Sequence, residues 1–390
     1  IVIWTVHRGT WTMFARHCPS PSIERNRVGF PARIVTVLVC LAFLAAGAFR
    51  GSALACAFHM YKPERTAVDW LIDGRKVALA RPDPLNEFAY KIIRVIRADG
   101  DGAIGRLPFL VSSQSRRQLA ANPEDAVLFA TGDDGQWKMV AYVNPEFRWI
   151  MTAVLEGADR WRSGYHPARF EMFAALQDHA DPAVRDLAIR ELDKAPYALL
   201  RRIDLRISAD ALLANLWTPS GYPYQSIRVL LLGLTRSDKA RSQIRGFIER
   251  VANWDEARNL GAFATALVEI DGRDGIVRLE DTILADRLQP LGKIEQVVEA
   301  LAIHNGLGSP DTSAAISAVL GRLVTLRPET AALVARQFAA RSDWSQAPSL
   351  QPLVRRNAIA ALPDRLAVES YLARAKAVGV MSRPSAPRGG

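Results

Sequence analysis

The feature that most constrains this fold is an apolar spacing that recurs after residue 160. Apolar residues at i, i+3, i+4 and i+7 share one face of an α-helix. The spacing occurs in full at four places, Ile227/Leu230/Leu231/Leu234, Ile244/Phe247/Ile248/Val251, Ile294/Val297/Val298/Leu301 and Ile316/Val319/Leu320/Leu323. Turn signals separate these stretches, so the pattern predicts helices of about 12–18 residues joined by short loops.

The clearest single helix is predicted over Asp181–Leu192. Asp181 is a residue type that caps helix N-termini, and Pro182 is favoured in the first turn. Four apolar residues then fall on one face of this helix: Val184, Leu187, Ala188 and Leu192.

This stretch resembles part of a known repeat. The segment His179–Leu192, with its Asp-Pro turn and Val184-Arg185 pair, is similar to the entry into the second helix of a HEAT repeat. The resemblance implies a HEAT-like α-solenoid, expected here over residues 161–378. Such arrays stack helix pairs and expose a long surface that usually binds other proteins.

Residues 56–160 have a different pattern. A short helix is predicted over Thr66–Asp73, and the chain returns to helix over Phe147–Leu155. Between them lie five short segments that read as strands, Lys76–Arg81, Phe88–Arg97, Leu107–Ser112, Ala126–Thr131 and Trp137–Val143. Strands at such spacing predict a small β-barrel or sandwich, OB-like in kind. The fold class expected for the whole chain is therefore α+β, mainly α.

Residues 1–55 read as a leader with a signal peptide. Arg25, Arg27 and Arg33 precede an apolar run from Ile34 to Phe49, and Ala53-Leu54-Ala55 follows as a small-residue cleavage site. The run has sixteen residues, which is short for a membrane span of about 20. We therefore expect export to the periplasm or cell envelope. The alternative is an uncleaved signal anchor.

Cleavage after Ala55 would make Cys56 the first mature residue. A Cys at that position suggests attachment of a lipid, the second route by which this chain could meet a membrane. Cys18 and Cys40 would leave with the leader, so the mature chain is expected to contain no internal disulfide. At the other end, residues 379–390 are rich in Pro, Ser and Gly and are predicted to be a flexible tail.

The wider arrangement resembles a group of uncharacterised exported bacterial HEAT-like proteins, in which a β-rich module precedes the helices. The pieces that carry this resemblance are Ala55-Cys56, Phe88–Arg97, Leu230–Leu234, Ala285-Asp286 and Asp343-Trp344-Ser345. The resemblance implies a fold and an exported location, and it implies no catalytic residues.

One group of residues could bind a metal. Cys56, His59 and Met60 lie within five positions at the expected mature N-terminus. Thiolate, imidazole and thioether together suit copper(I), or zinc if the Met is left out. The alternative is that these side chains only pack at the edge of the β-rich domain. Lipidation of Cys56 would exclude the metal site.

No motif points to catalysis. The chain contains no G-x-S-x-G, H-E-x-x-H, C-x-x-C or Walker sequence. We therefore expect a non-enzymatic scaffold, with other envelope or secreted proteins as partners. The alternatives are a copper or zinc protein and an unrecognised envelope hydrolase.

The net charge of +10 does not indicate a nucleic-acid partner. Six Arg and one Glu in residues 1–55 contribute +5 of it, which leaves a mild excess on the remainder. Arginine groups such as Arg116-Arg117, Arg201-Arg202 and Arg355-Arg356 are interspersed with Asp and Glu. This pattern is typical of solvated, partly ion-paired helix surfaces.

Overall fold

The structure is a computed structural model that describes residues 65–98, 106–162, 166–254 and 257–379. The chain divides into two compact units, 1–52 and 53–390, and every described residue belongs to the second. The predicted leader lies outside the described residues, as does the predicted tail beyond Gly379.

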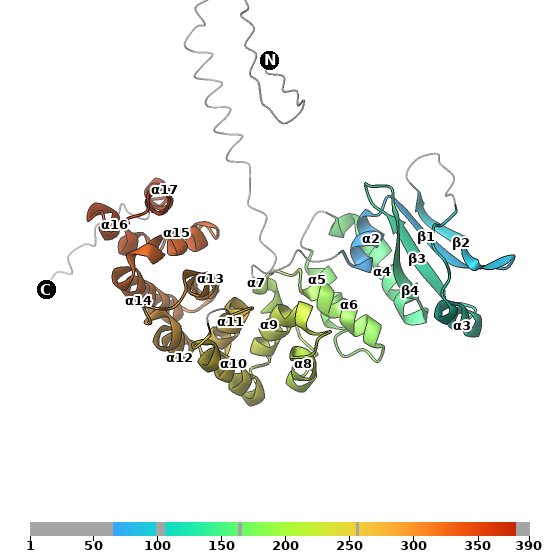
Figure 1. The fold of residues 1–390 in the computed structure, drawn as a ribbon, viewed down its shortest axis with the longest axis horizontal. Coiled ribbons are helices and arrows are strands. Elements are labelled where there is room, and N and C mark those ends of the chain that lie inside the picture. The colour runs from blue at the N-terminus through green and yellow to red at the C-terminus, as the bar shows by residue number, and fades with distance from the viewer. Residues whose placement is uncertain (1–64, 99–105, 163–165, 255–256, 380–390) are drawn as a thin grey trace, which may run out of the picture. The chain divides into compact units, whose positions relative to one another are not determined.

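The first described part of the chain builds a four-stranded antiparallel sheet (Figure 1). Its strand order is β2-β1-β3-β4, so β2 and β4 form the two edges. The elements of this region are α2 (Ala67–Asp73), β1 (Lys76–Asp83), β2 (Asn86–Ala98), α3 (Ser113–Ala121), β3 (Ala126–Thr131), β4 (Trp137–Val143) and α4 (Pro145–Trp161).

Helices α2 and α4 cover one face of the sheet, and on the other face Leu119 of α3 packs with Leu107 and Val111 in a smaller core. The described strands form one open sheet, so the prediction of a barrel or sandwich is wrong for the described residues. Successive residues of β3 enter two different cores, as the pleat of a strand requires. Leu128 joins the core shared with α2 and α4, while Phe129 joins a smaller one with Leu119 of α3. Burial of the sheet is incomplete, because Ile93 and Val95 of β2 and Met139 of β4 are about half exposed.

Four of the five predicted strands are confirmed, together with the short helix at residues 67–73. The fifth, Leu107–Ser112, is wrong. This segment makes only an isolated bridge between Leu110 and Ala89, and Ser112 then caps α3. Helix α3 was missed because it is polar and buries a single side chain, Leu119, so it has no apolar period to recognise.

From residue 167 onward the described chain is helical. The helices are α5 (Pro167–Ala174), α6 (Pro182–Leu192), α7 (Tyr197–Leu200), α8 (Ala209–Leu216), η1 (Tyr222–Tyr224), α9 (Gln225–Thr235), α10 (Asp238–Val251), α11 (Leu260–Asp271), α12 (Arg273–Leu279), η2 (Glu280–Leu284), α13 (Leu291–Leu307), α14 (Pro310–Leu326), η3 (Pro328–Thr330), α15 (Ala331–Ala339), α16 (Ala347–Arg355) and α17 (Leu362–Ala377).

From α8 onward these helices form two rows. Each odd-numbered helix from α9 to α17 packs on the next odd-numbered one, α9 on α11, α11 on α13, α13 on α15 and α15 on α17. Even-numbered helices pair likewise, α8 with α10, α12 with α14 and α14 with α16. Consecutive helices thus alternate between rows, as they do when helical hairpins stack.

The predicted helical faces are the ones that pack. Asp181 caps α6 by accepting a hydrogen bond from the amide of Ala183 at 2.8 Å. All four apolar residues predicted for the α6 face are buried. In α10, Ile244 and Ile248 are fully buried, as the spacing predicts.

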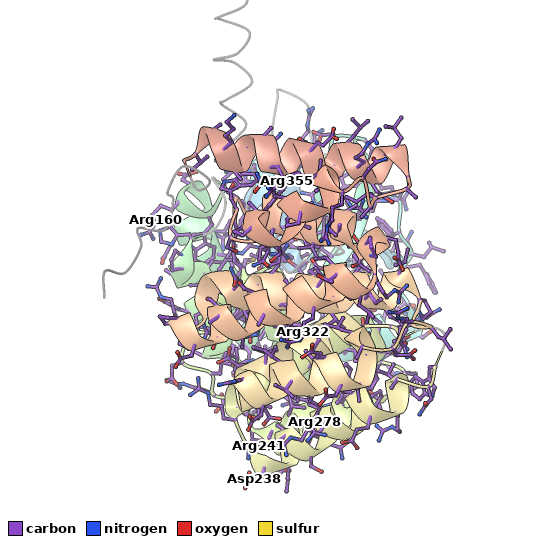
Figure 2. All side chains as sticks on the ribbon, turned by 90° about the vertical axis from the view of Figure 1, so that its left-hand side faces the viewer. Arg160, Asp238, Arg241, Arg278, Arg322 and Arg355 are labelled. Carbon is purple, nitrogen blue, oxygen red and sulfur yellow. The ribbon has the colours of Figure 1, made fainter. Side chains whose placement is uncertain are left out.

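Several surface arginines of the even-numbered row form ion pairs, and Figure 2 shows where Arg241, Arg278 and Arg322 lie. Arg278 on α12 contacts Glu249 of α10 at 2.9 Å, and Arg322 on α14 contacts Glu280 of η2 at 2.6 Å. Arg241 on α10 contacts Asp271 at 3.1 Å. The expectation of a partly ion-paired surface is confirmed at these positions. An exposed pair such as Arg278–Glu249 contributes about 0–1 kcal/mol, so it favours the row geometry only slightly.

The domain boundary predicted at 160/161 stays a prediction. Side chains from both sides of it meet in an ion cluster, in which Arg169 of α5 contacts Asp69 of α2 at 2.9 Å. Within the described part of the chain, no helix combines the length and the apolarity that crossing a membrane requires.

Candidate functional site

A large cavity lies where the helical rows begin. Its volume is about 1130 Å³, slightly above the range of about 300–1,000 Å³ that is usual for ligand sites. It is lined by the turn after α7, the segment leading into α8, the junction of α9 and α10, and one residue each from α11 and α13.

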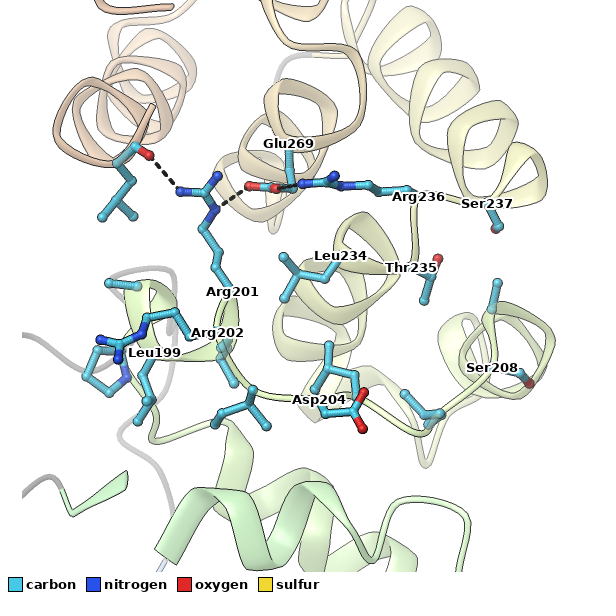
Figure 3. A pocket seen from close by; sticks show the side chains of 18 of the residues that line it. Leu199, Arg201, Arg202, Asp204, Ser208, Leu234, Thr235, Arg236, Ser237 and Glu269 are labelled. Atoms are coloured by element: carbon cyan, nitrogen blue, oxygen red, sulfur yellow. Dashed lines mark hydrogen bonds and ion pairs between the residues drawn. The ribbon is translucent and has the colours of Figure 1, made fainter. Parts of the chain in front are cut away.

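Glu269 of α11 is the central charge of this cavity (Figure 3). Its carboxylate is only 2% exposed and binds two guanidinium groups, Arg201 at 2.8 Å and Arg236 at 3.1 Å. Arg201 is held further by donating to the main-chain oxygen of Leu307 at 2.7 Å. One carboxylate shared by two arginines leaves a positive excess, which favours an anionic ligand.

The backbone positions Arg236 in an unusual way. Arg236 ends α9 with φ of 51°, a left-handed conformation that glycine normally provides at this position. This left-handed conformation costs a non-glycine residue roughly 1–2 kcal/mol. The conformation directs the guanidinium to Glu269, as Figure 3 shows. A strained arginine on the wall of a cavity is an arrangement that often accompanies function.

One wall of the cavity is an extended segment, residues 203–208. Its side chains alternate, with Ile203, Leu205 and Ile207 packed against the core and Asp204 and Arg206 exposed. Among the described residues, no hydrogen bond involves the backbone of residues 204–207. Backbone N–H and C=O groups that lack partners need water or a ligand.

Two helix N-termini also border the cavity. Ser208 caps α8 by accepting from the amide of Ala211, and Ser237 caps α10 by accepting from the amide of Ala240. Both caps line the cavity wall. The partial positive charge of these helix ends adds to the field of the arginines.

His304 lies behind Glu269 and is not available as a base. It is 2% exposed, and Nε2 donates to the carbonyl oxygen of Thr265 at 2.9 Å. Burial lowers the pKa of His304 to about 4, against a smaller raising effect of the bond to Thr265. The ring is therefore neutral at neutral pH and packs edge-on to Tyr197, whose hydroxyl donates to Glu269 at 3.2 Å.

A second charged cluster lies between α2, α5 and α6, and its charges neutralise one another. Lys194 contacts Asp69 at 2.5 Å and Glu191 at 2.8 Å, and Arg169 contacts both acids as well. Burial raises the pKa of Asp69, but Lys194, the amide of Thr66 and Arg169 together outweigh it, and the net shift is downward. The hydroxyl of Thr66 also donates to Glu191. The two acids and the two bases of this cluster pair with one another. The cluster therefore has no net charge that could bind a charged ligand.

The cavity residues were not predicted as a site. Arg201-Arg202 was noticed and interpreted as solvated surface, and Glu269 carried no signal because helical spacing places it among apolar neighbours of α11. The predicted metal residues, Cys56, His59 and Met60, lie outside the described residues, so that site stays a prediction. Within the described ranges no group of three His, Cys, Asp or Glu residues could hold a metal ion.

Comparisons with known proteins give no assignment, because no family model, no curated protein and no solved structure matches this chain. The resemblance to HEAT-like proteins therefore stays a prediction, and function must be argued from the cavity itself.

Proposed function

We propose that this protein is a non-enzymatic, HEAT-like scaffold of the cell envelope that binds an extended, acidic segment of another exported protein. The observation that carries the proposal is the segment 203–208 along one wall of the large cavity, because the backbone of residues 204–207 makes no hydrogen bond with any residue that the structure describes. An extended peptide laid beside such a segment can pair with it as an added strand.

The charges of the cavity support an acidic partner. Three arginines line it, Arg201, Arg202 and Arg236, against two acids, Asp204 and Glu269. Arg202 is exposed and makes no ion pair with a described residue. Carboxylates on the peptide would bind the guanidinium groups while its backbone pairs with the segment.

The alternation of helices between two rows supports the solenoid part of the proposal. Export rests on the predicted signal peptide alone. If that peptide is cleaved, the partner is another envelope or secreted protein.

Selection from a random peptide library tests the binding function. The full-length chain is expected to enrich peptides rich in Asp and Glu. The substitution Arg202→Glu should weaken the binding of these peptides at least tenfold. Arg355→Glu makes the same charge change on α16, away from the cavity, and should leave binding unchanged. Selection of no peptide, or equal loss in both variants, would contradict the proposal.

A further inference from the structure

A second and smaller cavity lies beside the first and contains a buried arginine. Its volume is about 430 Å³, and it is bordered by α6, α8, the turn before α9 and α9 itself. Ile207 lines both cavities, so the extended segment passes between them. Nothing in the proposed peptide-binding function uses this second space.

Arg228 of α9 is the unusual residue. It is only 7% exposed, and within the described chain no hydrogen bond or ion pair reaches its guanidinium, of which Nε is completely buried. Asp186 of α6, the acid whose charge acts on Arg228, is exposed, and among the described residues no ion pair joins the two. A buried charge without a partner is costly, and proteins normally pair it or bind an ion there.

Gln177 is the second unsatisfied group in this cavity. It is 2% exposed, and neither its amide nitrogen nor its amide oxygen has a partner among the described residues. Buried polar side chains are nearly always hydrogen-bonded, so each exception calls for an explanation. Here a donor, an acceptor and a guanidinium lie unsatisfied on the wall of one cavity.

The other arginines of the cavity are held in place. Arg185 donates to the carbonyl oxygens of His179 at 2.5 Å and Ala180 at 2.9 Å. Arg190 donates to the hydroxyl of Tyr224 at 2.6 Å and lies over its ring. Three arginines, Arg185, Arg190 and Arg228, line this cavity together with one acid, Asp186.

We propose that this cavity is a binding site for a small organic anion, a carboxylate or a phosphate ester, whose charged group pairs with Arg228 and whose polar part bonds to Gln177. Arginine matches both oxyanions because its N–H groups can donate to two oxygens at once. Inorganic phosphate would fill only a fraction of 430 Å³, which favours an organic ligand. Burial lowers the pKa of Arg228, against the raising effect of Asp186, as expected of a cation that lacks a close counterion.

Calorimetric titration of the full chain with glycerol phosphate and with succinate tests the site, with glycerol as the uncharged control. One of the two anions should bind saturably, and glycerol should not. Which anion binds distinguishes a phosphate ester from a carboxylate. Arg228→Met should weaken that binding at least tenfold, whereas Arg355→Met should not change it.

The melting temperature of the unliganded variants provides an independent test. Because Met removes an unpartnered buried charge, Arg228→Met should melt at a higher temperature than the wild type. Gln177→Leu removes two unpartnered amide atoms without a change of charge and should do the same. Binding of neither anion, binding that survives Arg228→Met, or a lower melting temperature in both variants would overturn the proposal.

Discussion

Arg169 on α5 and Glu191 on α6 form a buried two-point contact, in which Nε and Nη2 of the guanidinium both donate to Oε2 of the carboxylate, at 2.8 and 2.6 Å. The Glu191 side chain is completely buried. Because Arg169 also reaches Asp69 of α2, this contact joins the helix beside the sheet to the start of the helical region.

Glu191→Gln should destabilise the protein by about 3 kcal/mol, because it leaves two buried cations with one carboxylate. Urea unfolding measures the change. Glu171→Gln on α5 removes an exposed carboxylate and serves as the matched control, with an expected change below about 0.5 kcal/mol. Similar small changes in both variants would show that the buried cluster does not stabilise the fold.

His304 should make the protein acid-sensitive. Its pKa is about 4 when folded and about 6.5 when unfolded, so between these values the unfolded chain takes up a proton that the folded protein does not. The contribution is fully present above pH 6.5 and is lost as the pH falls toward 4, by roughly 3 kcal/mol in all. His304→Gln should remove this part of the pH dependence. An equal difference in unfolding free energy between variant and wild type at pH 7 and pH 4.5 would contradict the assignment.

Asp181 tests α6, the helix that the sequence predicts most clearly. Asp181→Ala removes the cap of α6 and also the bond that Asp181 accepts from Asn144 at 2.8 Å. We expect a loss of about 1–2 kcal/mol in unfolding free energy. Asp178→Ala, an exposed aspartate three residues earlier, should cost nothing measurable. Equal effects would mean that α6 does not depend on its cap.

Arg236 is expected to contribute to the binding of acidic peptides without contributing to the stability of the protein. Arg236→Gly relieves the left-handed backbone and should leave the melting temperature equal or higher, while the affinity for acidic peptides falls. Ser342→Gly relieves the same kind of conformation, with φ of 53°, away from the cavity. It should raise stability without any change in peptide binding. Retained peptide affinity in Arg236→Gly would remove Arg236 from the site.

The sequence predicts the helices well because the apolar residues that follow the helical period are also the residues that the fold buries. The four full repeats of the apolar spacing fall in α9, α10, α13 and α14, and their residues are buried except Leu234, which is half-buried. Strands β1 to β4 were also recognised. The closure of the sheet was not, because alternation within a strand cannot say whether a helix or another sheet covers each face, and α3 has no apolar period of its own.

The sites could not be predicted for a different reason. Glu269 meets Arg201 and Arg236 only because three helices converge, and Gln177 and Arg228, 51 positions apart in the sequence, line the same cavity. A buried arginine without a partner looks the same in a sequence as a surface one. Only the packing of α6 against α9 shows that Arg228 lacks a counterion.

The central claim is that the backbone of residues 204–207, which makes no hydrogen bond with a described residue, pairs with a bound peptide. Hydrogen exchange of these amides tests the claim most directly. In the free protein these amides should exchange almost as fast as in an unfolded chain, because nothing in the described structure bonds them. Saturation with a selected acidic peptide should slow some of them at least tenfold, with no change in the amides of α16. Slow exchange in the free protein, or rates at residues 204–207 that the peptide leaves unchanged, would contradict the account.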